Sequence, residues 1–177
     1  MEPFFAIYSV NEPGISAAQL GLVFSCRSSG QFFVVLFVPF LVDSLGSERL
    51  LRYILGLQAA AMLLMGCAAY VATSAGTYPA LTLTAMLARG ITVGAFEVVM
   101  RHVMVLSALV DVPSVVGWTG VAAHLGTILG PLVGAQLYAV GGFQLPFTVG
   151  GLCILAACVA WSTLPVSPHD SAAASTT

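Results

Sequence analysis

Residues 112–140 read VPSVVGWTGVAAHLGTILGPLVGAQLYAV, and no charged side chain interrupts them. The hydrocarbon core of a bilayer is about 30 Å thick, and about 20 predominantly apolar residues of α-helix are enough to cross it. A helix also satisfies its own backbone hydrogen bonds, which lipid cannot do for it. The stretch therefore predicts a transmembrane helix.

Four further segments have a similar length and apolar character. Together with the first, the spans are predicted at about 16–40, 50–73, 79–106, 113–140 and 143–164. The connections are short, so consecutive spans are expected to be antiparallel neighbours. The predicted fold is an all-α transmembrane bundle of five helices within residues 1–165. The Pro-, Ser- and Ala-rich tail at 166–177 is expected to be disordered.

The composition of the whole chain fits a membrane environment. Hydrophobic residues make up 59% of the chain and charged residues 7%, whereas a soluble domain averages about 25% charged residues. The lipid bilayer is therefore the first predicted partner. The net charge of −2 and the lack of clustered basic residues argue against nucleic acid as a partner. No metal-ligand spacing, phosphate-binding glycine loop or nucleophile motif is present, so the sequence predicts no metal, no cofactor and no enzymatic activity.

The arginines predict how the bundle is oriented. Arg49 and Arg52 flank the first connection and Arg101 lies near the third, while the alternate connections carry no Lys or Arg. Because basic residues gather on the cytoplasmic side of membranes, residues 43–52 and 101–113 are predicted to be cytoplasmic. With five spans, the C-terminus is then cytoplasmic as well. Either the plasma membrane or a vesicular membrane is compatible with the sequence.

The fourth span carries a stripe of small residues. Its members are Gly117, Gly126, Gly130, Pro131 and Gly134. The spacing G-x-x-x-G-x-x-x-G lets another membrane helix approach closely, because no side chain separates the two backbones. The proline removes one backbone hydrogen bond and is expected to bend the helix. The stripe is either a static packing seam or part of a bent helix that moves against its neighbour during transport.

The pattern G-x8-G-x3-G-P-x2-G-A resembles the antiporter motif on the fifth helix of the major facilitator superfamily. Ala135 stands where that motif has a final glycine. The first connection resembles the superfamily's G-x-L-A-D-R-x-G-R-R loop through Leu41, Asp43 and Gly46. The loop departs from the pattern at other positions, and Arg49 is expected to supply a displaced cation. In this sequence the loop comes before the glycine motif, which is also their order in the superfamily.

Stretches within residues 3–24 and 129–147 resemble the vesicular amine transporter-like branch of the drug:proton antiporters, so the resemblance extends over about residues 3–165. It implies that the five spans are helices two to six of that fold and that the sequence is an incomplete fragment, whose partner is the missing helix one and C-terminal half or a partner bundle. The implied function is proton-coupled antiport of small organic solutes, such as amines or other cations, by alternating access. The alternative is a truncated, transporter-like membrane subunit that binds partner helices and does not transport.

Two arginines lie inside predicted spans, where a charge costs about 2.5–3.5 kcal/mol on insertion scales. Arg89 lies about 15 Å into its span at 1.5 Å per residue. Its position resembles that of an arginine on the superfamily's fourth helix. It could bind a carboxylate or couple proton movement, or it could satisfy a broken backbone or a buried acid. Arg27 is flanked by serines and Gln31, so it either lines a water-filled cavity or pairs with helix one.

Three further residues are candidates for gating or proton transfer. Glu97 and Arg101 stand four residues apart with the acid first, which favours an ion pair on one helix. They either form only that pair or join Asp43 and Arg49 in a cytoplasmic gate latch, as the resemblance implies. His124 lies in the fourth span and could relay protons, since histidine exchanges a proton near neutral pH, or it could pack through a hydrogen bond.

Overall fold

The computed structural model describes residues 16–71, 77–107 and 112–163, which form five helices and no strand. The helices are α2 (Ala17–Leu45), α3 (Ser47–Val71), α4 (Thr77–Ser107), α5 (Val112–Gly141) and α6 (Gln144–Thr163). All five are long and apolar enough to cross a membrane. The all-α fold and its five spans are therefore confirmed. The tail at 166–177 lies outside the described residues.

The first connection is much shorter than the sequence indicates. The predicted spans end at about residue 40 and begin again at about residue 50, but α2 continues to Leu45 and α3 begins at Ser47. Only Gly46 separates the two helices, with φ 77° and its N–H donating to the Val42 carbonyl oxygen at 2.9 Å. Glycine adopts a positive φ without steric cost, so a single residue is enough to turn the chain.

The start of α2 agrees with the prediction and has a complete N-terminal cap. The Ser16 hydroxyl accepts a hydrogen bond from the Gln19 N–H at 3.3 Å. The Gln19 side chain in turn accepts from the Ser16 N–H at 2.9 Å. This reciprocal pair is a capping box, which satisfies two donors that the first turn leaves open.

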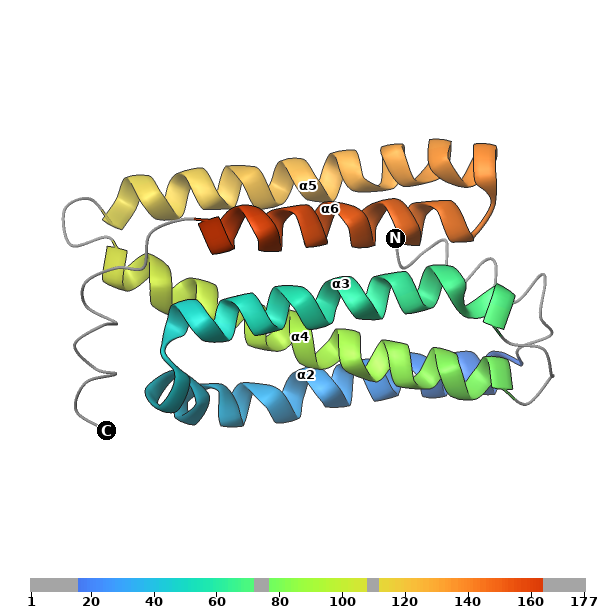
Figure 1. The fold of residues 1–177 in the computed structure, drawn as a ribbon, viewed down its shortest axis with the longest axis horizontal. Helices are drawn as coiled ribbons and strands as arrows, with labels where there is room; N and C mark the ends of the chain where they lie inside the picture. The colour runs from blue at the N-terminus through green and yellow to red at the C-terminus, as the bar shows by residue number, and fades with distance from the viewer. Residues whose placement is uncertain (1–15, 72–76, 108–111, 164–177) are drawn as a thin grey trace.

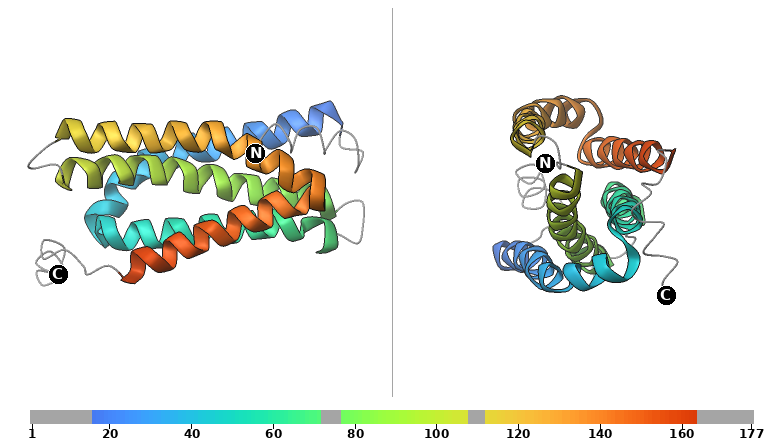
Figure 2. Two further views of the ribbon diagram at one scale, coloured as in Figure 1. Left: turned by 90° about the horizontal axis from the view of Figure 1, so that it is seen from above. Right: turned by 90° about the vertical axis from the view of Figure 1, so that its left-hand side faces the viewer.

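The helices are arranged around α4. Figure 2 shows α4 between α2 and α3 in the end view, with α6 beside α3, and α5 beside α6 and above α4. The extensive contacts are those of α2 with α4, α3 with α6 and α3 with α4, whereas α5 contacts mainly α6 and only a little of α4. In Figure 1 the helices run side by side along the long axis of the molecule. α5 is thus the least covered helix of the five.

The interior consists of two apolar clusters. One lies among α2, α3, α4 and α6 and contains Val23, Met62, Met65, Ala85, Met86, Phe143 and Phe147. The other lies toward the Gly46 turn and contains Val38, Leu50, Leu51, Ile54, Ala95 and Val99. The outward faces of α2 and α5 are also apolar and are exposed, for example at Phe40 and Trp118. Exposed apolar helix faces of this extent fit a lipid environment.

Candidate functional site

α2 and α4 approach each other so closely that their backbones touch. A Cβ placed on Gly90 would meet the backbone of Arg27, including its carbonyl oxygen. A Cβ placed on Gly94 would lie 2.9 Å from the Gln31 carbonyl oxygen, and one on Gly30 would lie 3.0 Å from the Leu87 carbonyl oxygen. These contacts define what we call the α2–α4 seam. At Gly90 and Gly94 a side chain would force the helices apart, and at Gly30 it would require the neighbouring atoms to shift by a few tenths of an ångström.

The sequence contains a signal for this seam that none of the predictions above includes. Gly90 and Gly94 are four residues apart, which is the G-x-x-x-G spacing by which membrane helices associate. The predicted packing surface was instead the longer glycine stripe in residues 117–134. Spacing alone does not rank two such stripes, because each becomes a contact only where another helix faces it.

The seam brings both intramembrane arginines to the same depth. Arg27 lies about 15 Å along α2 from its first residue, and Arg89 about 18 Å along α4, at 1.5 Å per residue. Gly90, which touches the backbone of Arg27, is the next residue after Arg89. Both side chains are half-buried, and the Nε of Arg27 and one terminal nitrogen of Arg89 are buried completely.

The surroundings of the two arginines are polar for a membrane interior. Gln31 lies one turn after Arg27 on the α2 face that meets α4. Thr92 is buried, and its hydroxyl donates to the Arg89 carbonyl oxygen at 3.1 Å. A guanidinium offers five donors in a fixed fork that suits carboxylates, and its charge acts strongly where water is scarce. The seam therefore has the chemistry for binding an acidic group or for holding a proton-carrying acid near mid-membrane.

Three glycines of the α5 stripe make no close contact with the other described helices. A Cβ added to Gly117, Gly126 or Gly130 would meet no atom within 4 Å, although Gly134 itself is buried. α5 runs unbroken through Pro131, which is exposed. Gly117, Gly126 and Gly130 therefore form no seam with the other described helices, and the role of the stripe in packing or motion stays a prediction.

His124 lies on the same uncovered helix. Its side chain is exposed, as are those of its neighbours from residue 121 to residue 129. The structure therefore does not bring His124 together with the two arginines of the α2–α4 seam. Its role as proton relay or packing residue stays a prediction.

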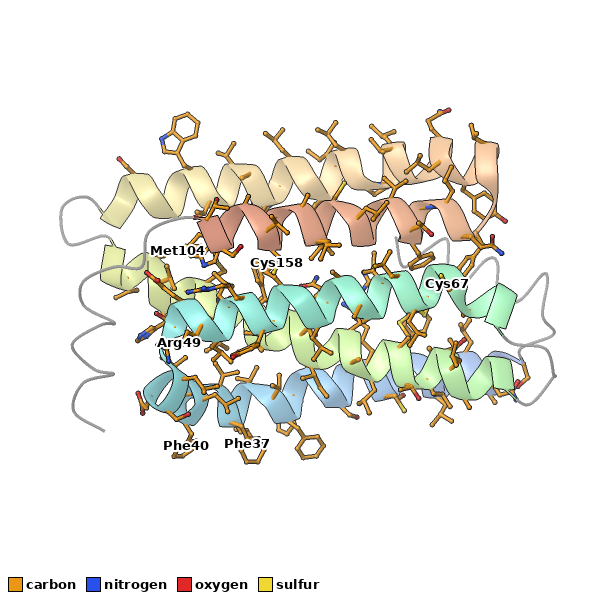
Figure 3. All side chains as sticks on the ribbon, in the orientation of Figure 1. Phe37, Phe40, Arg49, Cys67, Met104 and Cys158 are labelled. Carbon is orange, nitrogen blue, oxygen red and sulfur yellow. The ribbon has the colours of Figure 1, made fainter. Side chains whose placement is uncertain are left out.

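The residues of the expected gate latch lie toward the Gly46 end of the bundle, where Figure 3 labels Arg49 and Met104. Asp43, Arg49, Glu97 and Arg101 are all exposed, and no ion pair joins any two of these four described side chains. Leu41 is exposed too, and Gly46 forms the turn itself. The latch and the simpler Glu97–Arg101 pair both stay predictions.

The comparison with known proteins agrees with the membrane fold. No curated protein sequence and no solved structure gives a match. A family model described as Major Facilitator Superfamily matches residues 2–177, which is nearly the whole chain. Members of this family are membrane transporters, and the five apolar helices fit a multi-pass integral membrane protein that handles small solutes. By this match, the chain belongs to the Major Facilitator Superfamily.

Proposed function

We propose that this chain takes part in proton-coupled antiport of small organic solutes by alternating access. The observation that carries the proposal is the α2–α4 seam, where Arg27 and Arg89 lie at a similar depth on two helices in close contact. Ionisable groups inside membrane spans are costly and mark substrate or proton pathways. In this superfamily the solute site lies near the midplane, where the repeats meet. The resemblance of the sequence to the vesicular amine branch favours amines or other organic cations as solutes.

The packing of the helices supports the proposal that further helices pack against this chain. Each half of such transporters contains two inverted repeats of three helices. This symmetry relates α2 to α5 and α3 to α6, so α4 corresponds to a helix one. α4 packs against α2 and α3, and the equivalent place against α5 and α6 is uncovered among the described residues. We infer that a helix one and a second bundle complete the transport unit.

A second candidate function rests on the same uncovered surface. Gly126 and Gly130 offer a helix-docking stripe with open space in front of it, which would also suit a subunit that only binds other membrane helices. In that case the arginines of the α2–α4 seam would be structural. The two functions differ in whether these five helices can support transport when the remaining helices are supplied.

A chimera tests the proposed function. Residues 16–163 replace the corresponding five helices of a working proton-coupled amine antiporter of the superfamily, and the chimera is reconstituted into liposomes. An imposed pH gradient is expected to drive saturable uptake of a labelled amine, and a protonophore is expected to stop it. A folded chimera without uptake would favour the interaction subunit. Uptake that does not depend on the pH gradient would contradict proton-coupled antiport.

A further inference from the structure

An arginine in the contact between α3 and α6 has no part in the proposed transport. Arg52 lies on the α3 stripe that faces α6, because Leu63, three turns further along the same stripe, packs against Gly151. The Cys158 thiol donates to the Arg52 carbonyl oxygen at 3.6 Å, so α6 passes directly beside Arg52. The side chain of Arg52 therefore starts within the α3–α6 contact.

The guanidinium of Arg52 has a donor that the described helices leave unsatisfied. Its Nε is buried, and no acceptor among the described residues forms a hydrogen bond with it. The side chain as a whole is half-buried, so part of it can still be reached from outside. Buried donors in native proteins are almost always paired, because leaving one unpaired carries the full cost of removing it from water. Because the Nε itself is closed to outside groups, an anionic acceptor from outside the helices would bind the part of the guanidinium that can still be reached.

The residues around Arg52 indicate the depth at which that acceptor lies. Tyr53 is 67% exposed, and Trp161 of α6 packs half-buried against the apolar cluster near the Gly46 turn. Tyr and Trp gather at the level of the lipid headgroups. Arg49 lies one turn before Arg52 and is exposed, and Figure 3 shows Arg49 and Cys158 toward the same end of the bundle.

We propose that Arg52, assisted by Arg49, binds the phosphate group of an anionic phospholipid at the α3–α6 contact, with Trp161 beside the headgroup. A planar guanidinium binds phosphate through two parallel hydrogen bonds. The positive-inside prediction places this end of the bundle in the cytoplasmic leaflet, where anionic lipids are concentrated. The headgroup level and the two arginines together favour a lipid phosphate over a soluble one.

Lipid binding by the purified full chain in neutral detergent tests the site. The probes are phosphatidylglycerol, phosphatidylcholine and inorganic phosphate, and the readouts are bound lipid by native mass spectrometry and the midpoint of thermal unfolding. Phosphatidylglycerol is expected to bind and to raise the midpoint, and the other two probes are not. Arg52→Gln is expected to weaken phosphatidylglycerol about tenfold, a factor that corresponds to 1.4 kcal/mol.

Two further variants separate this site from general surface charge and from misfolding. Arg101→Gln removes the same charge from an exposed position on α4 and is expected to keep most of the affinity. Arg52→Lys keeps the charge without the fork and is expected to bind with intermediate affinity. Equal losses in the Arg52→Gln and Arg101→Gln variants, or equal binding of the two lipids, would overturn the proposal. If inorganic phosphate raised the midpoint of thermal unfolding as much as phosphatidylglycerol does, the proposal that the bound phosphate belongs to a lipid would be overturned.

Discussion

Gly90→Ala is expected to destabilise the bundle more than any other alanine substitution of a described glycine. The added Cβ would collide with the backbone of Arg27, and backbone atoms cannot move aside as the end of a side chain can. Forcing one methyl group into a closely packed interior costs about 1–3 kcal/mol, and we expect the upper part of this range. For a chain of this size that corresponds to a drop of roughly 5–10 °C in the midpoint of thermal unfolding.

Gly56→Ala is the matched control for this substitution. Gly56 lies inside α3, and an added Cβ would meet no atom within 4 Å. Because alanine is the better helix former by about 1 kcal/mol, this variant is expected to be as stable as the parent or slightly more stable. Both variants are measured in the same detergent by the loss of helical signal on heating. Equal midpoints for the two variants would mean that α2 and α4 do not touch at Gly90.

Arg89→Gln is expected to reduce pH-driven uptake by the chimera to background while the protein stays folded. The substitution removes a charge at mid-membrane depth but keeps a polar side chain of similar length. Arg89→Lys keeps the charge without the planar fork, so partial uptake is expected from it. Initial rates over a range of solute concentrations show whether the loss lies in solute affinity or in turnover.

Thr84→Ala on the same helix is the control for Arg89. The Thr84 side chain is exposed and its hydroxyl donates only to the Ala80 carbonyl oxygen, so this variant is expected to transport like the parent. Unchanged uptake by Arg89→Gln would show that Arg89 is a structural residue. An equal loss in both variants would point to damage to α4 as a whole.

The spans were predictable from the sequence because each depends on one helix alone. Length, hydropathy and a low content of charge define a membrane helix without reference to its neighbours, and the start of α2 after Ser16 follows from a local cap. The helical continuation of residues 43–45 and 47–49 was not predictable in this way. Polar residues suggested a loop there, but Gly46 can reverse the chain by itself.

The partners of the glycine stripes were not predictable, because they depend on which helices face each other. Gly126 and Gly130 match a family motif, yet they face open space in this chain. Gly90 and Gly94 belong to no motif that the sequence predictions used, yet they make the α2–α4 seam. The depth of Arg89 followed from counting residues, whereas the close approach of α4 to the Arg27 backbone required the structure.

Uptake by the chain alone, compared with uptake by the chimera, tests most directly whether these helices are one part of a larger transport unit. The chain is reconstituted into liposomes at a density that keeps it monomeric, which single-molecule photobleaching verifies, and a pH gradient is imposed. We predict no saturable amine uptake by the chain and clear uptake by the chimera under the same gradient. Saturable, gradient-driven uptake by the monomeric chain would contradict this result, since it would show that these helices transport without a second bundle.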